Sequence, residues 1–166
     1  MAVEPLFNLN EFDLSQTLAD HEGICARIPH RGNMLQIDRV IWAKEELMQG
    51  IGERDIRQDE FWVDGHFPGN PIMPGVLMVE AAAQLGCWVW MGNNQNSGRY
   101  LGLVKLDNIT VRGSASPGDT LYFLAKGKKW SPKKMVVRIQ AVRSDAIDRV
   151  VFDGVLTGMP LRMPVA

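Results

Sequence analysis

The stretch "GHFPGNPIMPGVLMVEAAAQLG", residues 65–86, joins a loop rich in glycine and proline to a long apolar segment. The apolar pattern runs on without proline to about residue 91, which is about five turns at roughly 3.6 residues per turn. Pro74 suits the first turn of a helix, and Gly92 suits its end. Because the segment is apolar on nearly every side, we expect a buried central helix over residues 74–91.

Segments with the alternation and β-branched content of strands lie on both sides of this helix. "QIDRVIWA" and "LMQGIGER" precede it, and "RYLGLVKLDNITV", "DTLYFLAKG", "KMVVRIQAVR" and "DRVVFDGVLTG" follow it. Residues 57–73 have neither pattern, so we expect an irregular loop there. The order predicts an α+β fold in which an antiparallel sheet wraps around one helix. Apolar spacing at Leu9, Phe12 and Leu18 also predicts a short helix over about residues 11–20.

Length and composition indicate one domain over residues 1–166 with a single core, because 46% of the residues are hydrophobic and 22% are charged. The net charge of −1 argues against a nucleic-acid partner. Cys25 and Cys87 have no CxxC spacing, so we expect a buried free thiol at Cys87 and a reducing compartment. We find neither a signal-peptide pattern nor a run of about 18 apolar residues, and we therefore expect a cytoplasmic protein without a membrane span.

Two titratable residues stand out in the opening stretch. His66 lies on a loop stiffened by its glycines and prolines, which suits a general base, although a lone loop histidine is also commonly bound to backbone. Glu80 lies in a helix without Lys or Arg, and a buried carboxyl without a cation favours its neutral form, which can donate a proton. A partner elsewhere in the fold is the structural alternative, and Gln84, one turn further on, shares its helix face.

Gly75 adds a third element at the start of the helix. The first amides of a helix have no acceptor within it and lie at the positive end of its dipole. Because Gly75 has no side chain, a carbonyl oxygen can approach its N–H closely. A base, an acid and such a donor together suit removal of a proton next to a carbonyl with loss of a group from the β carbon.

The same stretch resembles the signature of the β-hydroxyacyl-(acyl-carrier-protein) dehydratases of bacterial fatty-acid synthesis. In that family a catalytic histidine in H-F-P-G-x-P precedes a catalytic glutamate in E-A-x-A-Q by fourteen residues, which is the spacing of His66 and Glu80. "IPHRGNMLQIDRV" and "PGDTLYFLAKG" resemble two further family segments, and the likeness covers roughly residues 28–158. The N-terminal extension, residues 1–27, resembles nothing in the family, and we expect it to be partly helical.

The resemblance implies a hot-dog fold, a strongly bent antiparallel sheet around the long helix. It implies a homodimer, or a larger assembly of dimers, in which His66 of one subunit faces Glu80 of the other while the Gly75 N–H polarises the thioester carbonyl. Gln84 is implied as a helper of Glu80, and Phe67, Gly69 and Pro71 as residues that shape the site. The implied substrate is a 3-hydroxyacyl chain on acyl carrier protein, and no cofactor is required.

The segment "NMLQIDRV" is closer to the branch of the family that also isomerises a ten-carbon enoyl product. That branch carries aspartate where this chain has Glu80, so dehydration alone and dehydration with isomerisation both fit the sequence. Two other functions on the same fold are a thioesterase and a non-catalytic acyl-binding domain. Enoyl formation, free-thiol release or no reaction from a 3-hydroxyacyl thioester separates the three.

Two further patterns carry weaker hypotheses. His21, Cys25 and His30 do not have the spacing of a known zinc site, so we expect no metal, and the resemblance makes His30 a structural residue. Five lysines in "KGKKWSPKK" fit an exposed hairpin tip, with attraction of an acidic carrier protein as the alternative.

Overall fold

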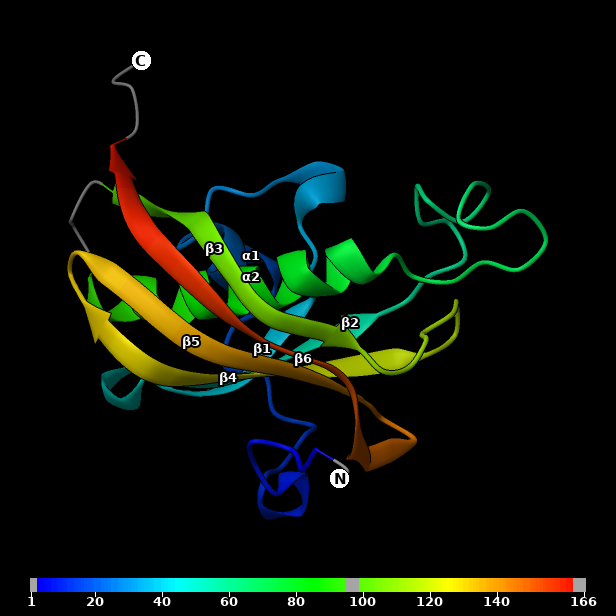
Figure 1. Cartoon of the computed structure of the whole chain (residues 1–166), viewed down its shortest axis with the longest axis horizontal. Helices are drawn as coiled ribbons and strands as arrows, with labels where there is room; N and C mark the ends of the chain where they lie inside the picture. Colours follow the sequence, from blue (N-terminus) through cyan, green and yellow to red (C-terminus); the bar gives the residue numbers. More distant parts are fainter. Residues whose placement is uncertain (1–2, 95–98, 163–166) are drawn as a thin grey trace.

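The computed structural model, which describes residues 3–94 and 99–162, is a six-stranded antiparallel sheet curved around one long helix, α2 (Gly75–Asn93) (Figure 1). The strand order is β1-β2-β4-β5-β6-β3, so β1 and β3 are the sheet edges. The strands are β1 (Arg39–Lys44), β2 (Gln49–Asp55), β3 (Arg99–Val111), β4 (Thr120–Ser131), β5 (Lys134–Arg143) and β6 (Ala146–Arg162). The predicted α+β fold, with two strands before the helix and four after it, is confirmed.

The inner face of the sheet packs against α2. Two glycines of β2 allow this close contact, because a Cβ at Gly50 would lie 2.8 Å from Val89 Cγ2 and one at Gly52 would lie 3.2 Å from Leu85 Cδ1. By length and composition α2 is the one candidate membrane span among the described residues, but 61% of that window is buried inside the protein. The helix therefore serves as the central core element, as its apolar pattern predicts.

The outer face of the sheet is covered by the N-terminal segment, residues 3–16, which lies on the side opposite α2 (Figure 1). Phe7 and Phe12 each meet Trp42 of β1 edge to face, with ring centroids 5.8 and 4.9 Å apart. Gln140 of β5, which is fully buried, accepts a hydrogen bond from the backbone N–H of Leu6 and donates one to the carbonyl of Glu4. These contacts fix the segment by both its side chains and its backbone.

The prediction of a helix over residues 11–20 is wrong. Only short helical turns flank this stretch, η1 (Leu9–Glu11) and α1 (His21–Cys25), and Asp20 caps the latter by accepting from the Gly23 N–H. Arg39 draws the intervening backbone away from helix geometry, since its guanidinium donates to the carbonyls of Leu14, Ser15 and Gln16. A tertiary contact therefore overrides the apolar spacing on which the prediction rested.

Adjacent residues of β2 serve opposite faces of the sheet, because side chains alternate along a strand. Glu53 pairs in register with Tyr122 beside the outer cluster and holds Arg39 through two hydrogen bonds of 2.6 Å. Arg54, the next residue, lies on the same side as Gly52 and α2. Two short turns complete the fold on this side, η2 (Gly32–Met34) and η3 (Glu45–Leu47).

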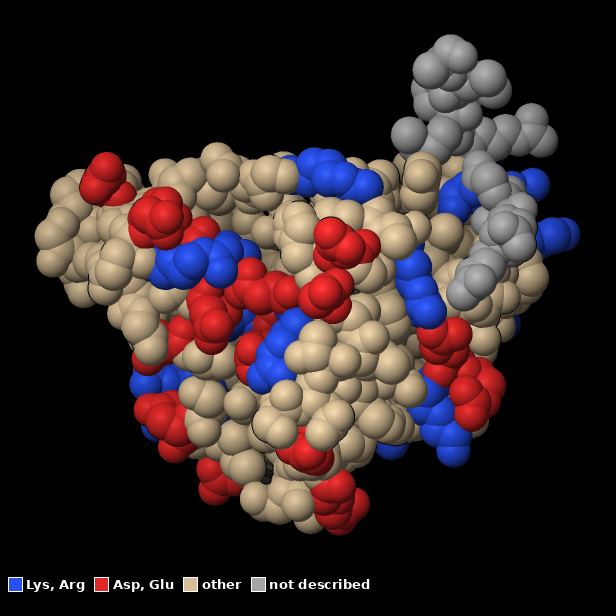
Figure 2. Space-filling model, turned by 180° about the vertical axis from the view of Figure 1, so that it is seen from behind, with Lys and Arg blue, Asp and Glu red and all other residues tan. Residues whose placement is uncertain are grey.

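The lysine-rich segment forms the exposed tip of the β4–β5 hairpin, as the exposed-tip hypothesis predicts. Trp90 Nε1 donates to the Ser131 carbonyl at 3.0 Å, which places this tip at the C-terminal end of α2. Figure 2 shows acidic and basic side chains interspersed on the face seen there, with broad uncharged areas between them. This mixture agrees with the small net charge.

Candidate active site

The loop between β2 and α2 holds His66 in one orientation. The backbone N–H of His66 donates to the Trp62 carbonyl at 2.8 Å, and the Ile72 N–H donates to the His66 carbonyl at the same distance. Gly69, at φ +75°, allows the turn in which Phe67 and Asn70 bond each other's backbone. Residues 57–74 therefore form an irregular but well-bonded loop, in agreement with the prediction.

The His66 ring has a defined tautomer. Nδ1 lies 2.7 Å from the carbonyl oxygen of Ile72, and a carbonyl can only accept a hydrogen bond. Nδ1 therefore carries the proton in the neutral ring, and Nε2 is left with a free lone pair. The ring also stacks on the exposed Phe67, with centroids 4.2 Å apart. This hydrogen bond to backbone fits both a structural histidine and a base that is held in one orientation.

Gly75 is the first residue of α2 and follows the loop directly. Its N–H makes no hydrogen bond within the described residues, as expected for the first turn of a helix. A Cβ at Gly75 would lie 2.9 Å from Val111 Cγ2, so a larger residue would require the Val111 side chain to move. The Gly75 N–H is therefore an available donor among the described residues, and the approach of a carbonyl oxygen to it stays a prediction. Pro71, the remaining shaping residue, is half-buried in the preceding loop.

Glu80 has partners that the helix sequence alone does not supply. Its side chain is 26% exposed, so it is less buried than expected. Gln84 Nε2 donates to Glu80 Oε1 at 2.8 Å, which is the expected contact one turn along the helix. The Gln84 amide is itself fixed, because it accepts from the Gln36 N–H and donates to the Met34 carbonyl.

His30 is the site residue that sequence reasoning missed. Its Nε2 lies 3.3 Å from the same Glu80 oxygen, Oε1. Burial lowers the pKa of His30, nearby Glu80 opposes this effect, and Arg31 adds to it. The signal lay in "IPHRGNMLQIDRV", which resembles a family segment and contains His30 and both backbone partners of Gln84. His21 does not join this cluster, since its Nε2 lies 3.7 Å from Cys25 Sγ instead.

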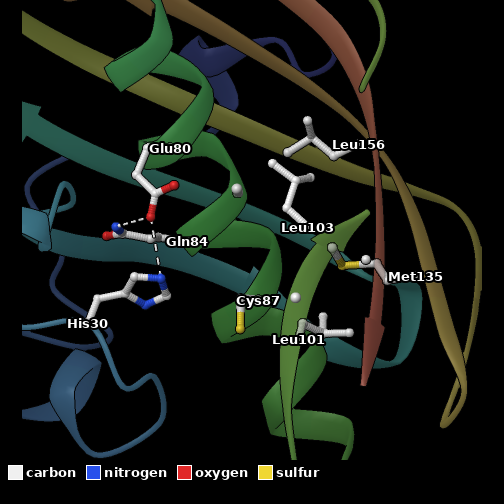
Figure 3. Close-up of a pocket in the computed structure, with 11 residues that line it drawn as sticks. His30, Glu80, Gln84, Cys87, Leu101, Leu103, Met135 and Leu156 are labelled. Atoms are coloured by element: carbon white, nitrogen blue, oxygen red, sulfur yellow. Dashed lines mark hydrogen bonds and ion pairs between the residues drawn. The ribbon is translucent and has the colours of Figure 1, made fainter. Parts of the chain in front are cut away.

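An apolar cavity of about 230 Å³ extends from Glu80 between α2 and the strands (Figure 3). His30, Glu80 and Gln84 line one end, and the walls beyond are formed by Ala83, Cys87, Leu101, Gly102, Leu103, Met135, Leu156 and Gly158. Burial raises the pKa of the Cys87 thiol to about 11, so this group is neutral at pH 7 and the wall carries no charge there. The cavity is therefore suited to a hydrocarbon chain with its polar end at Glu80.

The chain does not bring its own His66 and Glu80 together. His66 does not line the cavity, and no contact joins the two side chains among the described residues. Glu80, Gln84 and His30 line one end of the cavity, and His66 lies apart from them on its loop.

The curved antiparallel sheet around one long helix places the protein in the hot-dog class. The chain belongs to the FabA-like domain family, whose model matches residues 28–154. The N-terminal segment on the outer face lies outside this match.

Named relatives agree with this assignment. The chain is 38% identical over 104 residues to the 3-hydroxyacyl-[acyl-carrier-protein] dehydratase FabZ of Geobacillus thermodenitrificans, which covers 63% of this chain and 71% of the relative. Its fold is similar to the dehydratase heterocomplex ApeI:P of Xenorhabdus doucetiae, with a TM-score of 0.69, 14% identity and coverage of 83% and 90%. A hypothetical thioesterase with coenzyme A from Streptococcus pneumoniae also shares the fold, with a TM-score of 0.55, 9% identity and coverage of 85% and 93%.

Proposed function

We propose that this protein dehydrates (3R)-3-hydroxyacyl chains on acyl carrier protein to trans-2-enoyl thioesters in fatty-acid or related lipid biosynthesis. The observation that carries the proposal is the position of Glu80. Its carboxyl stands at the polar end of an otherwise apolar cavity, with one oxygen held by Gln84. A pocket that only bound acyl chains would gain nothing from a held carboxyl and would incur its desolvation cost.

The reaction needs one base and one acid. His66 Nε2 takes a proton from C2 of the acyl chain, and the electrons of that C–H bond form the C2=C3 double bond. The C3–O bond breaks, and the hydroxyl leaves as water with a proton from Glu80. Because Oε1 already accepts from Gln84, Oε2 is the oxygen free to deliver that proton. The Gly75 N–H stabilises the negative charge that develops on the thioester oxygen.

The separation of His66 from Glu80 supports a site shared between two subunits. β3 is an edge strand, and four of its apolar side chains are about half exposed: Leu103, Val104, Leu106 and Val111. Val76, beside Gly75, is 74% exposed. A second copy that covers this apolar edge at the start of α2 would bring its own His66 loop to the cavity. We therefore propose a cytoplasmic homodimer with two shared sites.

The carrier protein approaches, in this proposal, at the N-terminal end of α2. The Met73 N–H donates to the Ala115 carbonyl, which places the exposed Arg112 close to the start of the helix. The lysine hairpin lies at the other end of α2. Reversing the charge of Arg112 should therefore raise KM for a carrier-bound substrate but not for a small thioester, whereas reversal at Lys133 should change neither.

A product assay tests the reaction. On a 3-hydroxyacyl thioester the protein should produce the conjugated enoyl thioester without releasing free thiol. Thiol release would identify a thioesterase. No reaction across a series of chain lengths would leave non-catalytic acyl binding as the remaining function. The same series with a 3-hydroxydecanoyl substrate reports isomerisation through a second, non-conjugated product.

Subunit mixing tests the shared site. We expect His66→Ala and Glu80→Gln to be nearly inactive when each is alone. A mixed dimer has one site with both wild-type residues and one with both substitutions, so random exchange should restore about a quarter of the parental activity. Exchange that is demonstrated by mass but restores no activity would show that each subunit uses its own pair.

A further inference from the structure

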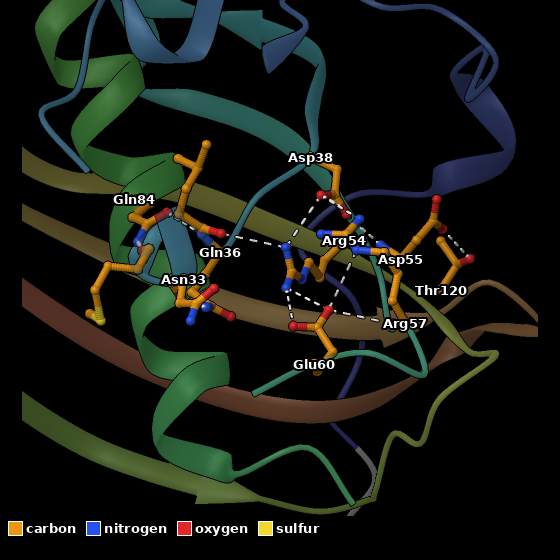
Figure 4. A network of polar contacts seen from close by, with 11 residues as sticks. Asn33, Gln36, Asp38, Arg54, Asp55, Arg57, Glu60, Gln84 and Thr120 are labelled. Carbon is orange, nitrogen blue, oxygen red and sulfur yellow. Dashed lines mark hydrogen bonds and ion pairs between the residues drawn. The ribbon is translucent and has the colours of Figure 1, made fainter. Parts of the chain in front are cut away.

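We infer that Arg54 is a positioning residue. It contacts neither His66 nor Glu80, but it fixes both the loop that carries His66 and the backbone that orients Glu80 within each subunit. The inference rests on the proposed dehydration. Arg54 lies on the inner face of β2, and its side chain is only 4% exposed (Figure 4).

One set of Arg54 contacts leads to His66. Nη2 donates to both carboxylate oxygens of Glu60, at 2.7 and 2.8 Å, and the Glu60 side chain is 7% exposed. Glu60 opens the turn that carries the base, since its carbonyl accepts from the Val63 N–H and the neighbouring Trp62 carbonyl accepts from the His66 N–H. The guanidinium therefore fixes the first part of the loop on which His66 lies.

The other set leads to Glu80. Arg54 Nη1 donates to the Leu35 carbonyl at 3.4 Å and to Asp38 Oδ1 at 3.3 Å. The residue after Leu35 is Gln36, whose N–H donates to the Gln84 side chain. Gln84 in turn donates to Glu80 Oε1 (Figure 3). Arg54 thus fixes the backbone that orients the acid as well as the loop that orients the base.

The energetics of Arg54 fit a positioning role better than a purely stabilising one. A buried ion pair contributes little net stability, because desolvation of both charges offsets their attraction. The Arg54 Nε–H is moreover buried without a hydrogen-bond partner in the described part of the chain, which is a further cost. The planar guanidinium is nevertheless the group that can bond a carboxylate and a backbone carbonyl at fixed angles, and lysine cannot replace that geometry.

The Arg39–Glu53 pair provides a control for Arg54, because Glu53 is the residue before Arg54 on β2. The Arg39–Glu53 pair also joins a guanidinium to both oxygens of a carboxylate, with side chains 23% and 10% exposed, but this pair holds the N-terminal segment on the outer face. Arg54→Lys and Arg39→Lys therefore remove the same kind of interaction from opposite faces of the sheet. Both variants should lower Tm by a similar amount, about 5–10 °C.

Only the inner variant should affect the chemistry. We expect Arg54→Lys to lower kcat about 10–100-fold with little change in KM, because small displacements of catalytic groups have effects of this size. Arg39→Lys should keep the parental kcat. Equal kcat values for the two variants, at equal loss of Tm, would show that Arg54 serves stability alone.

Amide hydrogen exchange gives a readout independent of activity. Arg54→Lys should speed exchange at the His66 and Gln36 amides, and Arg39→Lys only at residues in the N-terminal segment. This result would stand even if the parent formed no enoyl product, so the two proposals can fail separately. Unchanged exchange at both amides would overturn the positioning role. If Arg54→Lys does not fold, Glu60→Gln with Glu53→Gln as its control makes the same comparison.

Discussion

The two faces of the sheet are built with the same devices but contain different chemistry. On the inner side the buried amide of Gln84, from α2, bonds the backbone of residues 34 and 36, and on the outer side the buried amide of Gln140, from β5, bonds that of residues 4 and 6. In both cases a glutamine fixes a chain segment distant in sequence. The inner amide has one additional partner, the Glu80 carboxyl. The inner glutamine thus differs from the outer one in that it also holds a titratable group.

The largest expected effect comes from Glu80, which has no counterpart on the outer face. Glu80→Gln keeps the size of the side chain but cannot deliver a proton, so the rate should fall about 10²–10⁴-fold. The free energy of unfolding should stay close to the parental value, since this side chain is 26% exposed. Enoyl absorbance and thermal melting measure the two quantities. A variant as fast as the parent would make Glu80 a structural residue.

Replacing the two glutamines tests the comparison directly. Gln84→Leu and Gln140→Leu each leave a backbone N–H and a carbonyl without their partner, so both should lose about 2 kcal/mol of stability. Gln84→Leu should also lower kcat about tenfold, because Glu80 loses a donor. Gln140→Leu should keep the parental kcat at temperatures below its melting transition. Equal kcat values for both variants would show that Gln84 influences the reaction no more than Gln140 does.

A smaller effect is expected from the aromatic cluster on the outer face. Phe12→Ala removes the contact with Trp42 and should lower the free energy of unfolding by about 2 kcal/mol, which is less than for a fully buried phenylalanine. Denaturant titration gives this value, and kcat serves as the control. A fall in kcat while the protein is folded would indicate that the outer segment also influences the site.

The smallest effect concerns pH and His30. Because the pKa of His30 is lowered from its usual 6.5, the unfolded chain binds this proton at a higher pH than the folded protein does. His30 therefore makes stability fall as pH decreases from about 6.5 toward the lowered value. His30→Gln should show a weaker decrease over this window in melts at successive pH values. Parallel curves for the two proteins would mean that His30 titrates normally.

The parts of the structure that were predictable depend on local pattern. Alternation predicted the strands, and the largely apolar stretch without proline predicted α2 with Gly75, Glu80 and Gln84 in their relative places. The contact of His30 with Glu80 and the link through Arg54 did not follow from local pattern, because they join segments far apart in sequence. The helix expected over residues 11–20 failed for the same reason, since Arg39 lies well outside that stretch.

The alternation of Glu53 and Arg54 also protects the fold against mispairing. If β2 slipped by one residue against its neighbours, every side chain would turn to the other face. Arg54 would then face the N-terminal segment without Glu60, and Glu53 would face α2 without Arg39. Two buried charges would lose their partners at once, at a cost of about 3–5 kcal/mol each. The strand therefore has one favoured alignment. The charged pairs of Glu53 and Arg54, which fix segments on the two faces of the sheet, also disfavour a shifted register.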